Sequence, residues 1–206
     1  FQRAGALSGR RDDPAGASRP FAADSDGFVM AEGAAALVLE RSGDARARGR
    51  AAFAVLAGCG VSTDAHHPTA PHPEGRGAEA AVRTALAEAG VGTSDVDHVN
   101  AHATSTRQGD TAEGLMIGRV FPHGPSVTSA KGVLGHSLGA AGAVEALLTV
   151  LSLEHGVVPP TANVGAPAPD LGIDLVVKKP RERPVAVAVS DSFGFGGHNV
   201  SLVFTR

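Results

Sequence analysis

Two histidines and one lysine occupy positions where catalytic groups are often found. His102 ends the segment 96–102, which alternates as a strand does, and catalytic side chains gather where strands end in loops. Lys131 and His136 precede a long apolar stretch, and the glycines between them break the helix, so Lys131 is predicted in a loop. His136 would lie in the first helical turn, whose positive end favours a neutral, hydrogen-bond-donating imidazole. A lone histidine is more often a packed structural residue, but the neighbouring lysine favours a catalytic role.

A glutamate and the single cysteine are further candidates. Glu113 follows Asp110 at a spacing close to that of a helix capping box, and both that structural role and an electrostatic role near the site remain open. Cys59 lies between two glycines just beyond a predicted strand, 53–57, and is expected to be a small buried residue rather than a nucleophile. One cysteine excludes an internal disulfide and fits a reducing compartment.

Three distinctive segments predict neither a metal site nor a nucleotide site. The loop 63–73 contains three histidines, but three prolines stiffen it and no cysteine pair accompanies them, so we expect no metal. The Asp-rich segment 24–28 lacks the glycine and glutamate spacing of a calcium loop. The glycine-rich segment 192–199 is not followed by a helix, as a dinucleotide fingerprint would be. Its glycines alternate with Phe193 and Phe195, which suits a mobile apolar gate.

The elements that would position these groups are those of an α/β protein. After Ser137 the sequence is almost wholly apolar, and small residues at 139–143 predict a buried helix that lies close to other backbone. At roughly 17 residues with a glutamate inside, it is marginal as a membrane span, and we expect a core helix. A helix is predicted over 74–89, ended by Gly90, and a short charged helix should end near residue 49. Apolar or alternating segments predict strands at 34–40, 53–57, 96–102, 126–129, 174–177, 185–189 and 200–204.

Composition limits the class of protein. The chain has 206 residues, of which 43% are hydrophobic, enough for one core or two small fused cores. Its net charge of −3 does not suggest a nucleic-acid partner or a polybasic membrane contact. We see no signal peptide, and the opening residues lack an initiator Met and resemble the inside of a helix. We therefore expect a piece of a longer chain.

Four groups of residues, in order, resemble motifs of the β-ketoacyl-acyl carrier protein synthases. The segment 100–106 with Glu113 resembles their first histidine motif, and 131–142 resembles their lysine–histidine motif. The segment 192–199 resembles their C-terminal glycine-rich loop. Shorter matches occur at 19–21, 26–29 and 32–33. The resemblance covers essentially the whole chain and looks closest to the elongating synthase II branch, with Ala103 where many members have glycine.

The resemblance implies a thiolase-like fold, a layered αβαβα sandwich of two similar halves, in a cytoplasmic enzyme that is usually a homodimer. This chain would contain the C-terminal half, residues 51–206, and the end of the N-terminal half, residues 1–50. The family carries out decarboxylative Claisen condensation of malonyl-acyl carrier protein with an enzyme-bound acyl group in fatty acid elongation. Its partner is the acyl carrier protein, whose phosphopantetheine arm delivers the substrate, and no cofactor of its own is implied.

The matching positions imply roles for the candidate residues. His102 and His136 would be the two histidines of a Cys-His-His triad, donating to an enolate oxygen, and Lys131 would set the field around them. Glu113 matches a family glutamate near that lysine and could balance its charge. The implied substrate-binding residues are Thr104 and Thr106 for the phosphopantetheine arm, Phe193 and Phe195 for the gate, and Asp64, His67 and Thr69 for a second loop that moves with the gate.

One departure from the family pattern limits these implications. The family nucleophile is a cysteine of the N-terminal half, and Cys59 does not occupy a matching position. The chain alone is therefore expected to be inactive. Two alternatives remain open: a type II polyketide ketosynthase, and a catalytically silent partner subunit, although silent partners tend to lose the histidines and the lysine. A thiolase would need a second catalytic cysteine near the C-terminus, and none is present.

Overall fold

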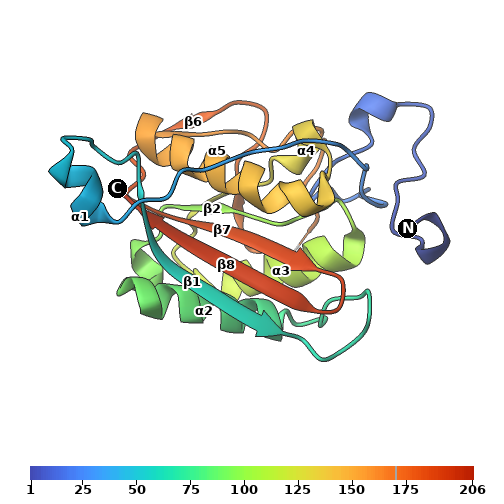
Figure 1. Cartoon of the computed structure of the whole chain (residues 1–206). Coiled ribbons are helices and arrows are strands. Elements are labelled where there is room, and N and C mark those ends of the chain that lie inside the picture. Colours follow the sequence, from blue (N-terminus) through green and yellow to red (C-terminus); the bar gives the residue numbers. More distant parts are fainter. Residues whose placement is uncertain (170) are drawn as a thin grey trace.

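The chain folds into three layers, with one sheet between helices on both of its faces (Figure 1). A computed structural model describes residues 1–169 and 171–206. One face of the sheet, here called the outer face, carries α2 (Arg76–Ala89) and α3 (Arg107–Val120). The opposite, inner face carries α5 (Ala141–His155). The predicted α/β class is thus confirmed, and this chain builds three layers.

Six strands form the central sheet in the order β1-β8-β7-β2-β3-β5. β2, β3, β5 and β7 run parallel, whereas β8 is antiparallel to both of its neighbours. Because parallel strands end at the same edge of a sheet, the residues that follow β2, β3 and β7 are brought together there. A separate two-stranded sheet pairs β4 (Val157–Val158) with β6 (Arg181–Glu182). The strands of the central sheet are Val55–Thr63 (β1), His98–Asn100 (β2), Ser126–Thr128 (β3), Asp174–Leu175 (β5), Val187–Gly194 (β7) and His198–Thr205 (β8).

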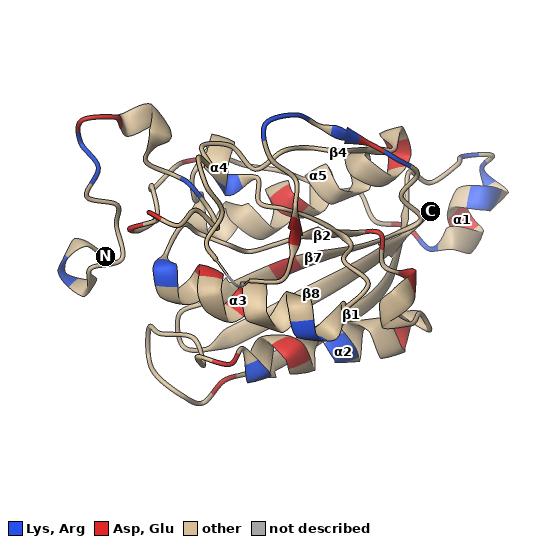
Figure 2. Cartoon of the chain, turned by 180° about the vertical axis from the view of Figure 1, so that it is seen from behind, with Lys and Arg blue, Asp and Glu red and all other residues tan. Residues whose placement is uncertain are grey.

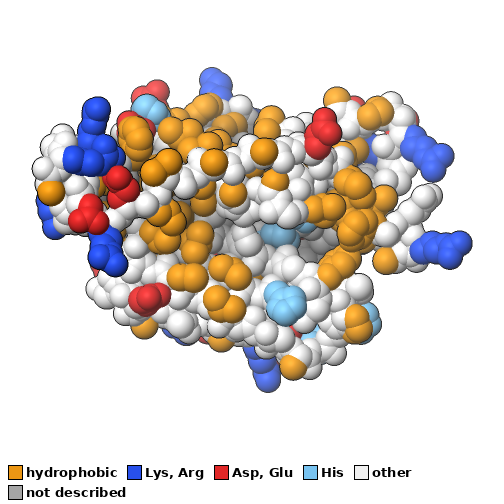
Figure 3. Space-filling model, in the orientation of Figure 1, with side chains coloured by type: hydrophobic (Ala, Val, Ile, Leu, Met, Phe, Trp, Pro, Cys, Tyr) orange, Lys and Arg blue, Asp and Glu red, His pale blue; other side chains and the backbone are white. Residues whose placement is uncertain are grey.

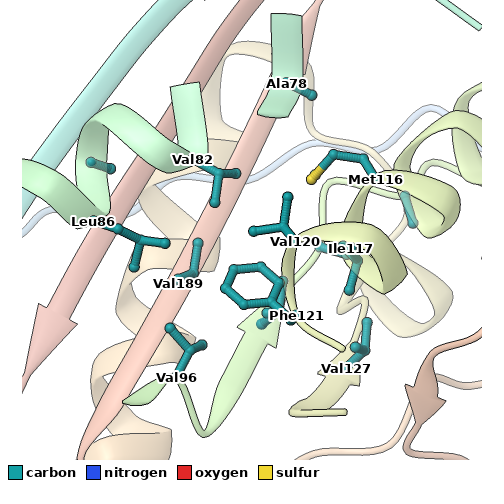
Figure 4. Close-up of a cluster of buried hydrophobic side chains, with 14 of the residues drawn as sticks. Ala78, Val82, Leu86, Val96, Met116, Ile117, Val120, Phe121, Val127 and Val189 are labelled. Atoms are coloured by element: carbon teal, nitrogen blue, oxygen red, sulfur yellow. The ribbon is translucent and has the colours of Figure 1, made fainter. Parts of the chain in front are cut away.

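Two apolar clusters hold the helices to the sheet. On the outer face, Val82 of α2 and Ile117 of α3 belong to a cluster with Val189 of β7 (Figure 4). On the inner face, Leu153 of α5 belongs to a cluster with Phe204 of β8. Full burial of one such side chain contributes about 1.5–3 kcal/mol, so these clusters fix both helical layers.

Two glycines of β1 let α2 lie directly against the strand. A Cβ atom added at Gly58 would lie 2.1 Å from the carbonyl oxygen of Ala85, and one at Gly60 would lie 1.8 Å from that of Ala81. Only glycine leaves room for this approach. As predicted, α2 ends at Gly90, which has the left-handed conformation typical of helix ends.

Charged residues lie along the outward sides of the outer helices, with both signs interspersed (Figure 2). Glu79 of α2 pairs with Arg83 at 2.8 Å and with Arg119 of α3 at 2.6 Å. Exposed pairs of this kind contribute about 0–1 kcal/mol each. The apolar contacts beneath them therefore hold α2 and α3 in place.

Two predictions about strands are wrong. Residues 34–40 are extended but belong to neither sheet, and Val38 is 90% exposed. An apolar run forms a strand only beside a partner strand, and none among the described residues pairs with it. Cys59 lies inside β1 rather than beyond it, because β1 extends to Thr63. Since the flanking glycines face α2, Cys59 points to the inner face, where it is exposed rather than buried.

The other predicted elements occur within a few residues of their expected bounds. The short charged helix is α1 (Ser42–Ala47), and the remaining strands coincide with β2, β3, β5, β7 and β8. Residues 1–50 contribute α1 and two short 3-10 turns but no strand of the central sheet. The domain boundary near residue 50 stays a prediction.

The backbone around Lys131 differs from the prediction. Lys131 begins a short helix, α4 (Lys131–Leu134), and does not lie in a loop. Gly135 ends α4 with φ 66°, and His136 forms an isolated β-bridge with Met30 instead of beginning a helix. Helical backbone resumes at Leu138.

By length and composition, the segment Leu138–His155 could cross a membrane, but core helices pass the same test, and α5 lies against the sheet.

Candidate active site

Nine of the eleven predicted site residues line one cavity of about 490 Å³. They come from the ends of β2 and β7, from the start of α3, from the segment after α4 and from the loop after β1. Figure 3 shows a hollow on this side of the molecule with histidine visible in it. Lys131 and His67 do not line the cavity. The nine lining residues are Asp64, Thr69, His102, Thr104, Thr106, Glu113, His136, Phe193 and Phe195.

The two candidate imidazoles lie side by side. The ring centroids of His102 and His136 are 5.4 Å apart, and the ring planes are nearly perpendicular, at 83°. The Nδ1 atom of each is buried without a hydrogen-bond partner among the described residues. Two rings at this distance can both donate to one oxygen atom placed between them.

Both imidazoles are neutral at pH 7. Burial, assisted by the charge of Lys131, holds the pKa of His102 well below its usual value. The same two causes lower the pKa of His136 to about 4. The neutral state expected for His136 therefore has a different cause from the predicted one, because burial and the lysine lower the pKa and no helix begins at this residue. A neutral imidazole keeps one N–H, so each ring can stabilise a developing negative charge without first losing a proton.

Lys131 acts on the histidines from behind the cavity. Its side chain is 2% exposed, and Nζ forms an ion pair with the Glu145 carboxylate of α5. The Ser18 hydroxyl donates to the Lys131 carbonyl oxygen, which fixes the backbone of α4. Burial raises the pKa of Glu145, and the lysine opposes that rise.

Glu145 is a functional residue that the sequence prediction missed. The expected partner of Lys131 was Glu113, whereas the ion pair is with Glu145. A carboxylate in the middle of an apolar stretch of helix is a detectable signal, since buried charges need a partner. Lys131 lies 14 residues earlier and is the nearest preceding cation in the sequence.

Glu113 instead fixes the loop that carries His102. Its two carboxylate oxygens accept hydrogen bonds from the backbone N–H groups of His102 and Ala103, both at 2.7 Å. The capping-box interpretation is wrong, because α3 begins at Arg107 and Glu113 lies in its second turn. Burial and the nearby Asp191 carboxylate raise the pKa of Glu113.

Asp110 is a second residue whose role the sequence did not reveal. Its carboxylate accepts from the backbone N–H of Phe21 at 2.7 Å and of Ser105 at 3.1 Å. Ser105 has φ 70°, a strained value for a side chain other than glycine, and Asp110 holds it there. The flanking hydroxyls of Thr104 and Thr106 are thereby kept 3.0 Å apart in the cavity wall.

The two predicted mobile loops contact each other at the cavity mouth. The Gly196 N–H donates to the Pro68 carbonyl at 2.7 Å, and the Asn199 amide donates to the Asp64 carboxylate at 2.8 Å. Phe193 is half-buried, with its ring 5.7 Å from that of His102, whereas Phe195 is exposed in the turn before β8.

His67 shapes the second loop rather than lining the cavity. Its Nδ1 atom accepts from the backbone N–H groups of Thr69 at 3.2 Å and Ala70 at 3.1 Å. The cavity contains no thiol, because the only cysteine of the chain lies in β1. The functional roles of the lining residues stay predictions.

Comparisons with known proteins agree with this geometry. The "Beta-ketoacyl synthase, C-terminal domain" model matches residues 53–165, and the "Beta-ketoacyl synthase, N-terminal domain" model matches residues 1–45. The 3-oxoacyl-[acyl-carrier-protein] synthase 2 of Mycobacterium tuberculosis is 46% identical over 97% of this chain and 48% of its own length. The corresponding Synechocystis protein is 44% identical over 100% of this chain and 50% of its own. The chain thus spans about half the length of the curated relatives it matches.

Solved structures of ketosynthases share this fold. A beta-ketoacyl synthase from Burkholderia phymatum superimposes with a TM-score of 0.96 at 37% identity, covering 100% of this chain and 50% of that one. A type II polyketide ketosynthase, solved in complex with an acyl-carrier protein, has a TM-score of 0.95 at 33% identity and covers 100% and 52%. These likenesses confirm the predicted thiolase-like class.

Proposed function

Because the chain belongs to the beta-ketoacyl synthase family, we propose that it is the histidine-bearing half of an enzyme that elongates fatty acids. The reaction is the decarboxylative condensation of malonyl-acyl carrier protein with an enzyme-bound acyl group. The observation that carries this proposal is the pair of neutral imidazoles, 5.4 Å apart, on one cavity wall.

Both imidazole rings act in the first chemical step. When the malonyl group loses CO2, the electron pair of the broken carbon–carbon bond moves into the thioester, and negative charge develops on the thioester oxygen. His102 and His136 donate hydrogen bonds to that oxygen and stabilise the enolate. Burial keeps both rings neutral, and Lys131 assists, because a second positive charge beside its ammonium is unfavourable.

The second step needs a group from outside the cavity described here. The enolate carbon attacks the carbonyl carbon of an acyl thioester, and a cysteine thiolate leaves as the new carbon–carbon bond closes. No lining residue is a cysteine, so the thiolate must come from a part of the synthase that this chain does not match. Thr104 and Thr106 would hold the phosphopantetheine arm, and Phe193 and Phe195 would close the cavity behind the substrate.

Partner and location follow from the same proposal. The acyl carrier protein is the substrate donor. A homodimer and a cytoplasmic location are expected from the family resemblance. The polyketide ketosynthase among the similar structures favours one alternative, polyketide chain extension by the same chemistry. The silent-partner alternative is disfavoured, because His102, His136 and Lys131 are all present.

The first prediction tests the histidine pair in a complete enzyme. This chain replaces the matching half of the Mycobacterium tuberculosis synthase, and CO2 release from carboxyl-labelled malonyl-acyl carrier protein is measured. His102→Ala or His136→Ala should lower the rate on the order of a hundredfold, the cost of losing one preorganised donor. His155→Ala, an exposed residue at the end of α5, should leave the rate unchanged. Release at the parent rate from either of the first two variants would refute the proposal.

A further inference from the structure

The two segments that carry the imidazoles leave neighbouring strands of the sheet. β2 and β3 pair as far as Asn100 and Thr128, and the last backbone hydrogen bond runs from the Ala101 N–H to the Thr128 carbonyl at 2.8 Å. The structure describes the segments that follow, 102–106 and 129–136, throughout, and no backbone hydrogen bond joins one to the other. The pairing of the strands therefore does not by itself fix the distance between the two histidines.

The hydroxyl of Ser129 joins the two segments. It donates to the Ala103 carbonyl at 2.8 Å, which is the only hydrogen bond between these described segments. The Ser129 side chain is fully buried and does not line the active-site cavity. The Ala103 N–H donates to Glu113 at 2.7 Å, so the residue after His102 is held at its amide by α3 and at its carbonyl by Ser129.

Ser129 is itself fixed from the side of β3. Its backbone N–H donates to the Thr161 hydroxyl at 3.0 Å, and the Thr161 N–H donates to the Val176 carbonyl at 2.8 Å. The Ser129 hydroxyl also accepts a longer hydrogen bond, 3.4 Å, from the N–H of Lys131, where α4 begins. The loop of His102 is thus tied to the same framework that positions α4.

We propose that Ser129 is a positioning residue for the reaction proposed above, and that its buried hydroxyl sets the place of the His102 ring beside that of His136. The inference rests on the proposed function, because the reaction requires both rings to donate to one oxygen atom. Among the described residues, this hydroxyl is the only donor to the buried Ala103 carbonyl. Without it the carbonyl would be buried and unsatisfied, so the loop would shift to find another donor. A shift of about 1 Å at a reacting centre can lower a rate by on the order of a hundredfold.

The first test uses a complete enzyme, in which this chain replaces the matching half of the Mycobacterium tuberculosis synthase. Ser129→Ala should lower kcat for CO2 release from malonyl-acyl carrier protein by about tenfold or more, because one hydrogen-bond donor is displaced. KM should stay within about twofold of the parent value, since Asp110 still holds Ser105 between the two threonines that would bind the arm.

Ser152→Ala is the matched control. Ser152 of α5 is 3% exposed, and its hydroxyl donates to the Leu148 carbonyl of its own helix at 3.0 Å. The substitution removes the same atom from a similarly buried site outside the cavity, so both kinetic constants should stay at the parent values.

The second test needs no activity and uses the 206-residue chain. The His102 and His136 rings, with centroids 5.4 Å apart, should show a nuclear Overhauser effect between their ring protons in the parent chain. In Ser129→Ala this effect should be lost or weakened, and the His102 ring signals should shift. His98 is the internal reference, because its ring is buried on β2 before the loop and bonds to the Ser126 carbonyl at 2.9 Å. Its signals should not change, which separates displacement of one loop from general loosening of the fold.

Four outcomes would overturn the proposal. Three are a parent kcat in Ser129→Ala, an equal fall of kcat in Ser152→Ala, and an unchanged Overhauser effect between the two rings in Ser129→Ala. The fourth is a shift of the His98 signals in Ser129→Ala, since general loosening of the fold would then explain the loss of rate. A parent enzyme that releases no CO2 would count against the proposed function, and the ring signals would still decide whether Ser129 positions His102.

Discussion

At the scale of single residues, the site depends on groups that burial makes unusual. His102 and His136 are neutral because burial and a nearby ammonium both disfavour a second positive charge. Lys131 is itself buried and is compensated by Glu145 from a different element. Replacing either member of such a pair alone leaves a buried charge without a partner, which typically destabilises a protein by about 3–5 kcal/mol.

Asp191 predicts an unusual dependence of stability on pH. It is fully buried, and neither carboxylate oxygen has a hydrogen-bond partner among the described residues. Burial, assisted by the charge of Glu145, raises the pKa of Asp191 from 3.8 to about 7. The folded chain therefore holds an extra proton between these two values. Stability from this group is complete below about pH 4 and is lost as the pH rises to about 7, by on the order of 4 kcal/mol.

Urea unfolding of the chain and of Asp191→Asn at pH 5 and pH 7.5 measures this effect. Between the two pH values the variant should lose less unfolding free energy than the parent, or gain more, because an amide does not ionise. The lowered pKa values of the buried histidines and the raised pKa values of Asp110 and Glu113 act on both proteins, so the difference between the two reports Asp191. Asp12→Asn, at an exposed position, should behave like the parent. Equal losses in the parent and in Asp191→Asn would contradict the assignment.

At the scale of elements, the closest packing lies between β1 and α2. The backbone of α2 rests on Gly58 and Gly60, and a methyl group at Gly60 would overlap the carbonyl of Ala81. A helix backbone cannot move aside as a flexible side chain does, so α2 would have to lift from the sheet. The position of α2, the predicted helix 74–89, thus depends on two glycines of β1. Judged by strand propensity alone, these glycines would only weaken β1.

Gly60→Ala should therefore be costly. We expect a loss of about 3 kcal/mol or more in unfolding free energy, which is at or beyond the upper end of the destabilisation usually caused by overpacking a core. Gly43→Ala in α1 is the control, because a Cβ there meets no atom within 4 Å, and alanine favours a helix. Thermal melts followed by circular dichroism would show the difference. Equal melting temperatures for the two variants would mean that α2 does not touch β1 as described.

Periodic elements were predictable from the sequence, and contacts between distant elements were not. The helix 74–89 and the strand that precedes His102 follow from local pattern and stop signals. The ion pair between Lys131 and Glu145 and the hydrogen bond from the Phe21 N–H to Asp110 join elements whose approach no local pattern specifies. Residues 34–40 show the converse: the pattern is that of a strand, but a strand needs a neighbour.

At the scale of the whole molecule, the fold brings most of the predicted site together, but no cysteine lines the cavity to serve as the nucleophile of the proposed reaction. The motifs after β2 and β7 converge because parallel strands end at one edge. Cys59 lies away from that edge, on β1 at the side of the sheet, and points to the inner face. The resemblance predicted the residues of the site, and the topology explains why nine of the eleven line one cavity.

The chain by itself should therefore form no β-ketoacyl product. Acyl- and malonyl-acyl carrier proteins are incubated with the 206-residue chain, and product is sought by mass spectrometry, with the complete Mycobacterium tuberculosis synthase as the positive control. Product formed by the chain and abolished in Cys59→Ser would reveal that this cysteine reaches the cavity.

The two imidazoles are positioned by different segments of the chain. The loop of His102 is held by Glu113 of α3, whereas the backbone N–H of His136 donates to Val29 and its carbonyl accepts from Ala31. Val29 and Ala31 belong to the piece that the N-terminal domain model matches. The distance between the two rings therefore depends on how residues 1–45 pack against the rest of the chain, so a substitution that loosens this packing would displace one hydrogen-bond donor and leave the other in place.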